Sequence, residues 1–439
     1  MRDLLLIVIT AVCSLVAAWS PSSGLLAYVG YAVLNPQSYT WFYSHDFPHS
    51  KLIVAATLLG YIVSSQGKGF ARQRESFLIL ALWAMFGLST IFALDREAAK
   101  VEFINISKIL LMFFLATSLI NTEERIKLLS KVIALGLGLY GLKIGLFVIA
   151  TAGNAQVNGP EGSYLESNNT IGMALAMNVP LLFYISKTEP KKWLRRLMRV
   201  MMAFTYPAVA GTFARGDWIG LAIVTGLMLI KSRRKFLTWT AAALIAIICI
   251  AALPRLFSTR MVQRYDTLAN YEEDASAESR FWNWEFCRRV GLARPLTGGG
   301  FKFFSREAYA TYYPEFLQRW PGKVWSCHDT PLLVLSEHGV PALLTWVGLI
   351  ISCFFSLRAI RSFGRTHNDV SWLADYADML QIGLIGFLVM GIFVDFAYYE
   401  VFYQLVAIIV VIKQKIARRS LEKSSEPMIA GMKRVAVSS

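Results

Sequence analysis

The sequence predicts an all-α polytopic integral membrane protein with about 12 transmembrane helices and one long loop that contains short helices. Hydrophobic residues make up 55% of the chain and charged residues only 17%, below the roughly 25% charge of soluble domains. Basic residues gather in short segments such as "KKWLRRLMR" and "KSRRK", which mark the cytoplasmic side of a membrane. Apolar runs that approach the roughly 20 residues of a bilayer crossing recur along the chain, at 77–94, 132–150, 218–230, 239–253 and 382–394.

The order of these runs divides the chain into four parts. Residues 1–253 are predicted as the N-terminal transmembrane helices, beginning with a crossing at 4–34 that "WSPSSG" interrupts. A basic C-terminus and the parity of the spans place the loop 254–330 outside the cytoplasm. Residues 331–419 return to the membrane, and 420–439 form a polar cytoplasmic tail that we expect to be disordered.

The formal net charge of +15 has two interpretations. It could indicate nucleic-acid binding, but the basic residues lie in topological loops and no nucleic-acid motif accompanies them. The sequence therefore predicts contact with membrane lipids and no nucleic-acid partner. Cys287 and Cys327 both lie in the long external loop and could form a disulfide if that compartment is oxidising.

The first polar feature is the turn "GTFARGDWIGL", which places Arg215 and Asp217 between two apolar runs. An ion pair within a loop is one interpretation. The other is anion binding, because arginine is disfavoured on the external side and its fork of donors suits phosphate.

The second feature, "SRFWNWEFCRRVGLARPLTGGGFKFF", interleaves Arg280, Arg288 and Arg289 with aromatic residues. Arg280, Trp284 and Arg288 have the spacing of one helix face. Such a face could bind a pyrophosphate, or its arginines could simply contact lipid headgroups. The "TGGGF" within it lacks the strand and helix of a nucleotide site and is interpreted as a turn.

The third feature is "CHDTPLLVLSEHGVPALL", where Glu337 and His338 stand at the change from polar to apolar sequence. A satisfied interfacial histidine is the simpler interpretation. A neutral imidazole can also take a proton from a hydroxyl near neutral pH. Glu337 is expected to point elsewhere on the helix, and His328 lies too far away in sequence to form a metal pair. No carboxylate cluster or metal motif is present in the sequence, so we expect neither a metal ion nor a cofactor.

These stretches resemble the O-antigen ligase and polymerase superfamily of bacterial inner-membrane proteins. "GTFARGDWIGL", "SRFWNWEF…ARPLTGGGFKFF" and "CHDTPLLVLSEHGVPALL" are similar in order and spacing to that family's Arg-Gly turn, Arg/Trp-rich loop and loop end. His338, two residues after Ser336, resembles the lipopolysaccharide O-antigen ligase branch (WaaL type). The sequence departs from the family where His328-Asp329 replaces the common His-Asn and where "EHGVP" lacks a second glycine.

The resemblance implies a GT-C-like glycosyltransferase. It would transfer O-antigen from undecaprenyl pyrophosphate to a sugar hydroxyl of lipid A–core at the periplasmic face, without metal and with inversion. It implies His338 as the general base and Arg215 and Arg288 as ligands of the pyrophosphate, with Arg280, Arg289, Glu337 and His328 as secondary candidates. An O-antigen polymerase and a protein O-oligosaccharyltransferase of the same superfamily remain alternatives. "YAVLNPQSYTWF" resembles a stretch of exosortase-associated putative ligases, which keeps a protein acceptor possible. A transporter of polyisoprenoid-linked glycan is the alternative from another class.

Overall fold

A computed structural model describes residues 2–64, 69, 71–232 and 275–417 of the chain. The prediction of an all-α polytopic membrane protein is confirmed, because the described residues form helices and contain no strand. Seven of these helices are long and apolar enough to cross a membrane. They are α1 (Arg2–Trp19), α5 (Arg74–Ile91), α6 (Arg96–Leu119), α7 (Glu123–Ala150), α8 (Asn168–Thr188), α16 (Thr330–Thr366) and α17 (Trp372–Gly391).

Shorter helices complete the bundle: α2 (Pro21–Leu34), α4 (His49–Val63), α9 (Lys192–Ala210), α10 (Arg215–Ile230) and a final helix at 400–417. Three very short helical elements, η1 (Pro36–Tyr39), α3 (Tyr43–Asp46) and η3 (Asn368–Val370), lie in connections. The expected interruption of 4–34 is present, since α1 ends at Trp19 and α2 begins with Pro21. The predicted run at 239–253 lies outside the described residues, so the count of twelve spans stays a prediction.

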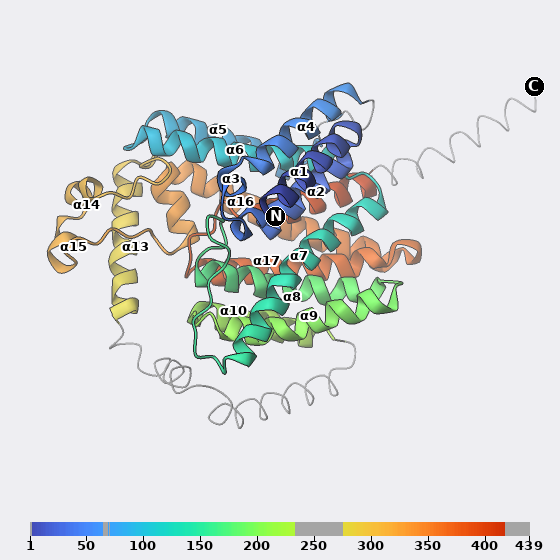
Figure 1. Cartoon of the computed structure of the whole chain (residues 1–439). Helices are drawn as coiled ribbons and strands as arrows, with labels where there is room; N and C mark the ends of the chain where they lie inside the picture. Colours follow the sequence, from blue (N-terminus) through green and yellow to red (C-terminus); the bar gives the residue numbers. More distant parts are fainter. Residues whose placement is uncertain (1, 65–68, 70, 233–274, 418–439) are drawn as a thin grey trace, which may run out of the picture.

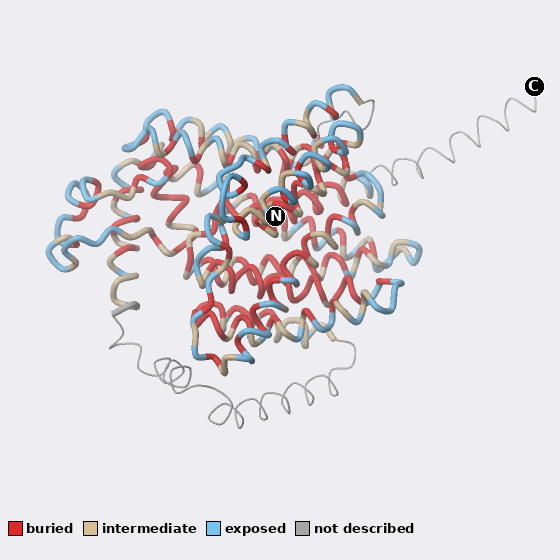
Figure 2. The backbone as a smooth tube through the Cα atoms, in the orientation of Figure 1, coloured by how far each residue is buried: buried red, intermediate tan, exposed pale blue. Residues whose placement is uncertain are grey.

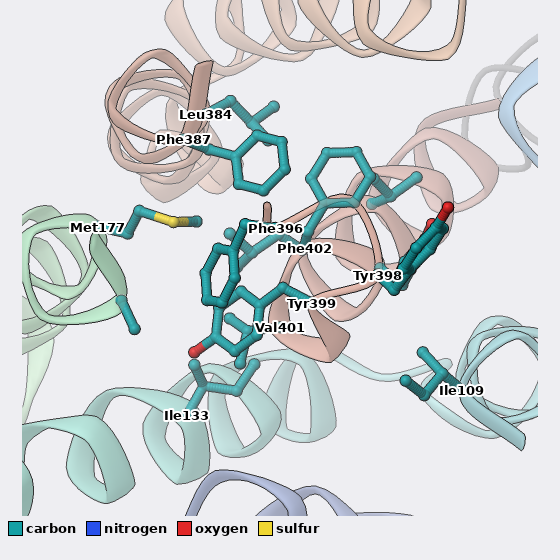
Figure 3. Packing of buried hydrophobic residues seen from close by; sticks show 14 of the residues in the cluster. Ile109, Ile133, Met177, Leu384, Phe387, Phe396, Tyr398, Tyr399, Val401 and Phe402 are labelled. Atoms are coloured by element: carbon teal, nitrogen blue, oxygen red, sulfur yellow. The ribbon is translucent and has the colours of Figure 1, made fainter. Parts of the chain in front are cut away.

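The helices pack in a defined order across the molecule. α16 lies between α5 and α17, α17 packs on α8, and α8 packs on α9 and α10 (Figure 1). Buried residues follow the middle of this order, whereas exposed residues predominate on the outer helices (Figure 2). Near the centre, Phe387 and Phe402 stack with ring centroids 4.6 Å apart, and Phe396 and Tyr399 stack at 4.1 Å. Tyr398 lies apart from both stacks (Figure 3).

The described part of the long loop covers one end of the bundle. It contains α13 (Ala275–Ala293), α14 (Arg306–Tyr312) and α15 (Pro314–Arg319). α13 runs across the ends of the membrane helices and packs on α16 (Figure 1). Cys287 of α13 is joined to Cys327 by a disulfide with a Cα–Cα distance of 6.0 Å. The pairing that the sequence left open is therefore formed, and it holds α13 against the segment that leads into α16.

α16 is the element that carries the main candidate residues. Asp329 caps its first turn by accepting a hydrogen bond from the backbone N–H of Leu332 at 2.7 Å, as N-cap carboxylates do. The helix is interrupted at Gly339, whose φ of 82° belongs to the left-handed region that only glycine adopts without strain. Its far end is held by Glu75 of α5, which is fully buried and accepts hydrogen bonds from Ser352 and Ser356.

Candidate active site

His338 is buried and has a hydrogen-bond partner on each side of its ring. Only 1% of the residue is exposed. Its Nδ1 lies 2.6 Å from the hydroxyl of Ser89 in α5, and its Nε2 lies 2.7 Å from the hydroxyl of Tyr398. The rings of Phe86 and Phe301 pack against the imidazole, with centroids 4.3 and 4.4 Å away. This histidine is therefore buried inside the protein and does not lie on its surface.

Glu337 shares the Tyr398 hydroxyl with His338. Tyr398 donates a hydrogen bond to Glu337 Oε2, and that oxygen lies 3.8 Å from His338 Nε2. The second carboxylate oxygen accepts the backbone N–H of Lys302 at 2.8 Å. The expectation that Glu337 points elsewhere is therefore wrong. Neighbouring side chains on a helix diverge, but one hydroxyl inserted between them can contact both.

One assignment of the protons satisfies this chain of contacts. If Tyr398 donates to Glu337, its oxygen can accept the Nε2–H of His338, and Nδ1 then accepts from Ser89. In the other tautomer Nδ1–H donates to Ser89, whose hydroxyl donates to the Phe86 carbonyl at 2.9 Å, and Nε2 can accept from Tyr398. Hydroxyl groups both donate and accept, so a proton can move along the row without a large displacement of any side chain. We call Ser89, His338, Tyr398 and Glu337 the buried relay.

The "TGGGF" turn forms the support under the relay. The interruption at Gly339 frees backbone carbonyls of α16 from helical bonds, and Gly299 N–H bonds to Ser336 O at 2.7 Å while Gly300 N–H bonds to Glu337 O at 2.9 Å. Gly298 has a φ of 59° and Gly300 a φ of 85°. A Cβ at Gly298 would lie 2.4 Å from the Glu337 carbonyl carbon. The predicted turn is thus a close backbone contact that requires glycine.

A cavity of about 500 Å³, with both charged and apolar residues in its wall, opens beside the relay. Glu337 and Tyr398 line it, whereas His338 does not. The other charged residues of its wall are Glu102, Lys302 and Asp395, so carboxylates outnumber ammonium groups. Any molecule in this cavity would meet the hydroxyl of Tyr398 before it could reach the imidazole. We call this space the relay cavity.

Arg280 brings the first two sequence features to the same end of the bundle. Its guanidinium lies 5.8 Å from the ring of Phe393, and the same ring lies against Gly216, next to Arg215 at the start of α10. Arg280 is also close enough for its charge to act on Asp217, whose side chain is buried. α10 and α13, which are far apart in sequence, therefore meet at Phe393, with Arg280 at this contact and Arg215 one residue before Gly216.

His328 and Asp395 lie next to this arginine group. His328 Nδ1 is 3.7 Å from Asp395 Oδ2. Burial lowers the pKa of His328, while the Asp395 charge opposes that effect. Asp395 also accepts the backbone N–H of Asp329 at 3.3 Å. Asp395 lines the relay cavity, and Arg280 is close enough for its charge to act on His328.

Arg288 and Arg289 are placed differently from Arg280. Arg288 is half exposed and pairs with Glu285 at 2.7 Å, and hydrogen bonds from Arg288 and Arg289 lower the pKa of Glu285 to about 2. Arg289 also stacks on Tyr313, with its guanidinium carbon 4.0 Å from the ring centroid. Neither arginine lines the relay cavity. The expected alignment of Arg280 with Arg288 therefore gives one arginine near α10 and one on the outer surface of α13.

Sequence reasoning missed several residues of this site, above all Ser89, Lys302 and Tyr398. Tyr398 lies in "DFAYYE", which attracts notice only as a loop without basic residues. A tyrosine pair followed by glutamate between two apolar runs is a usable signal, because such groups are rarely buried without a partner. Ser89 has no comparable signal, since serine is common within apolar helices.

The fold and the relay define a multi-pass helical membrane protein that holds buried acid–base groups beside the relay cavity. Residues 200–347, which include Arg215, Arg288 and His338, match the family model described as O-Antigen ligase (Wzy_C). This domain supports a relationship to the O-antigen ligase and polymerase superfamily. Residues 1–189 match a family of unknown function (DUF5935). No curated protein matches the chain.

Proposed function

We propose that this protein is an O-antigen ligase of the bacterial inner membrane. It would transfer O-antigen from undecaprenyl pyrophosphate to a sugar hydroxyl of lipid A–core at the periplasmic face. The observation that carries the proposal is the buried relay at the wall of the relay cavity, in a chain with an O-Antigen ligase domain. The disulfide between Cys287 and Cys327 supports an external, oxidising location for the loop.

The proposed reaction is a direct displacement at the anomeric carbon. The acceptor oxygen attacks that carbon as the bond to the phosphate oxygen breaks, so the configuration inverts and the pyrophosphate leaves with the bonding electrons. The acceptor proton passes to the relay, with His338 as the general base. Because the Tyr398 hydroxyl lines the cavity and His338 does not, the proton would enter through Tyr398 when His338 is in the tautomer whose Nδ1–H donates to Ser89. The acceptor proton then passes to the Tyr398 oxygen while Tyr398 gives its own proton to the free Nε2.

In this proposal the charges of the site place the two substrates at different positions. The relay cavity carries Glu102, Glu337 and Asp395 against Lys302 alone, which disfavours a pyrophosphate there. Arginine forks suit phosphate oxygens, so the donor phosphates are assigned to Arg215, with Arg280 beside it. Arg288 can take part once a phosphate replaces its partner Glu285. No step of this scheme needs a metal ion.

The test uses full-length protein in lipid nanodiscs with purified lipid-linked O-antigen and lipid A–core. Wild type should form ligated product, also in excess chelator, and His338→Ala should lose it while keeping the wild-type unfolding temperature within a few degrees. Chains that grow on the lipid carrier would show a polymerase, and transfer to a peptide serine would show a protein glycosyltransferase. Movement of the lipid-linked glycan between leaflets without product would show a transporter. Full activity of a folded His338→Ala variant would remove the imidazole from the mechanism.

A further inference from the structure

A second chamber adjoins the relay cavity and has no role in the scheme above. It has a volume of about 430 Å³, within the range of small-molecule sites. Its wall includes Glu102, Tyr164, Lys302 and Tyr399, which also line the relay cavity. The two spaces therefore share one wall, and a molecule bound in the chamber would lie next to Tyr398 and Glu337.

The chamber is built almost entirely by the domain of unknown function. All of its lining residues except Lys302, Tyr399 and Glu400 come from within 1–189, the range of the DUF5935 match. α2, η1, α4, α6 and the loop at 162–166 supply nearly all of them. Asn35 and Ser38 bond to the backbone carbonyl of Glu161 at 3.3 and 2.7 Å, which fixes that loop against the end of α2. The wall is therefore held in place by the chain itself.

Buried polar atoms in this wall lack partners within the protein. The hydroxyls of Tyr28 and Tyr399 and the Oε1 of Glu400 make no hydrogen bond, although these residues are only 0%, 4% and 8% exposed. The Tyr28 hydroxyl lies within hydrogen-bonding range of the Glu400 carboxylate, but the angle between the two groups is not that of a hydrogen bond. Buried polar groups without partners are costly, and three that face one chamber indicate a ligand that supplies both donors and acceptors.

The charges of the wall indicate what kind of ligand this is. Glu102, Glu166 and Glu400 outnumber Lys108 and Lys302, so an anionic pyrophosphate is disfavoured. Two tyrosine rings from α2, at Tyr28 and Tyr31, join Tyr164 and Tyr399 and offer flat apolar faces with hydroxyls at their edges. A neutral sugar ring, with apolar faces and hydroxyl groups around its rim, matches this combination.

We propose that this chamber is the acceptor subsite: it binds a neutral, hydroxyl-rich sugar unit and presents one of its hydroxyls to the relay. The N-terminal domain would then select the acceptor, and the ligase domain would carry out the transfer. This inference rests on the proposed function, because an acceptor exists only if the protein is a transferase. Glu400 and Tyr28 would bind the sugar hydroxyls, and Glu102 would hold the shared wall through its bond from Tyr164 at 3.0 Å.

The test has a binding arm that needs no catalysis. Core oligosaccharide released from lipid A–core is added to the full-length protein in nanodiscs, and its contacts are measured by saturation-transfer NMR. Wild type should bind it, and Glu400→Gln and Tyr28→Phe should weaken binding by about tenfold or more, the effect of one or two lost hydrogen bonds. Tyr206→Phe is the matched control, because that hydroxyl bonds to Thr225 away from the chamber.

The kinetic arm separates this inference from the proposed function. Glu400→Gln should raise the acceptor KM by about tenfold or more and change the donor KM by less than about twofold. An increase in the donor KM instead, or transfer in which neither variant differs from Tyr206→Phe, would overturn the acceptor subsite and leave the ligase intact. Oligosaccharide binding that the variants weaken, in a protein that forms no product, would support the chamber and contradict the ligase.

Discussion

Tyr398→Phe is the substitution that tests the relay most directly. It removes one oxygen atom that contacts Glu337 and His338 together and leaves the ring in place. Both of its partners are almost fully buried, and each group left without a partner costs about 1–3 kcal/mol of stability. Loss of a positioned proton acceptor slows a reaction by about 10²–10⁴-fold. The expected result is therefore a modest loss of stability and a large loss of kcat.

The assay is single-turnover ligation in nanodiscs at saturating donor and acceptor, with thermal unfolding followed by tryptophan fluorescence. Tyr403→Phe is the matched control: Tyr403 is also fully buried, and its hydroxyl donates one bond to the backbone carbonyl of Ala397 at 3.1 Å. This control should lose about 1 kcal/mol of stability and keep its rate. The reasoning is refuted if both variants lose similar stability and Tyr398→Phe transfers as fast as the control.

Two further predictions concern the supports of the site. Burial raises the pKa of Asp329 to about 6. The ionised carboxylate therefore lowers the stability of the folded protein fully only above about pH 6, and not below about pH 4, where Asp329 is protonated in both states. Asp329→Asn keeps the helix cap and is expected to raise the unfolding temperature at pH 8 but change it little at pH 4; equal shifts at both pH values would contradict the assignment. Gly298→Ala should cost about 2–4 kcal/mol, from backbone strain plus a clash with α16. Gly322→Ala, with a similar φ of 75° and open space around it, should cost less, and thermal unfolding of both variants compares them; equal losses would exclude the clash.

The helices of the bundle were predictable because a bilayer imposes length and hydropathy on each crossing. The run at 218–230 corresponds closely to α10, and the interruption before Pro21 is visible in the sequence. The left-handed residue inside α16 was not predictable from local sequence. "HGVP" suggests a change of direction, but the close approach of Pro295 in a distant turn is not visible locally. A Cβ at Gly339 would lie 2.4 Å from the Pro295 carbonyl oxygen, which also accepts the backbone N–H of Val340. Local propensity carries no information about such contacts.

The candidate-site residues also include some that the sequence predicts and some that it does not. His338 could be chosen because an ionisable group at the end of an apolar run is unusual. Its partners could not be identified, since Ser89 is 249 residues away in sequence and Tyr398 is 60 residues away. The assumption that Glu337 faces away followed from helix geometry alone. It failed because the geometry of one helix does not show which side chain from another helix lies between two neighbours.

The position of the arginines indicates where each of the two proposed substrates would bind. An anionic pyrophosphate is attracted most strongly to a nearby basic group whose charge is not already neutralised. Arg288 is already paired with Glu285 on the surface of α13. Arg280 instead reaches inward, to the ring of Phe393 beside the start of α10. Asp395 lines the relay cavity, and the charges of both Asp395 and Arg280 act on His328, so acidic and basic groups lie close together here. The anionic leaving group would bind better near the arginines than near the carboxylates. The uncharged acceptor hydroxyl would bind better near the carboxylates. This separation would orient the two substrates for transfer.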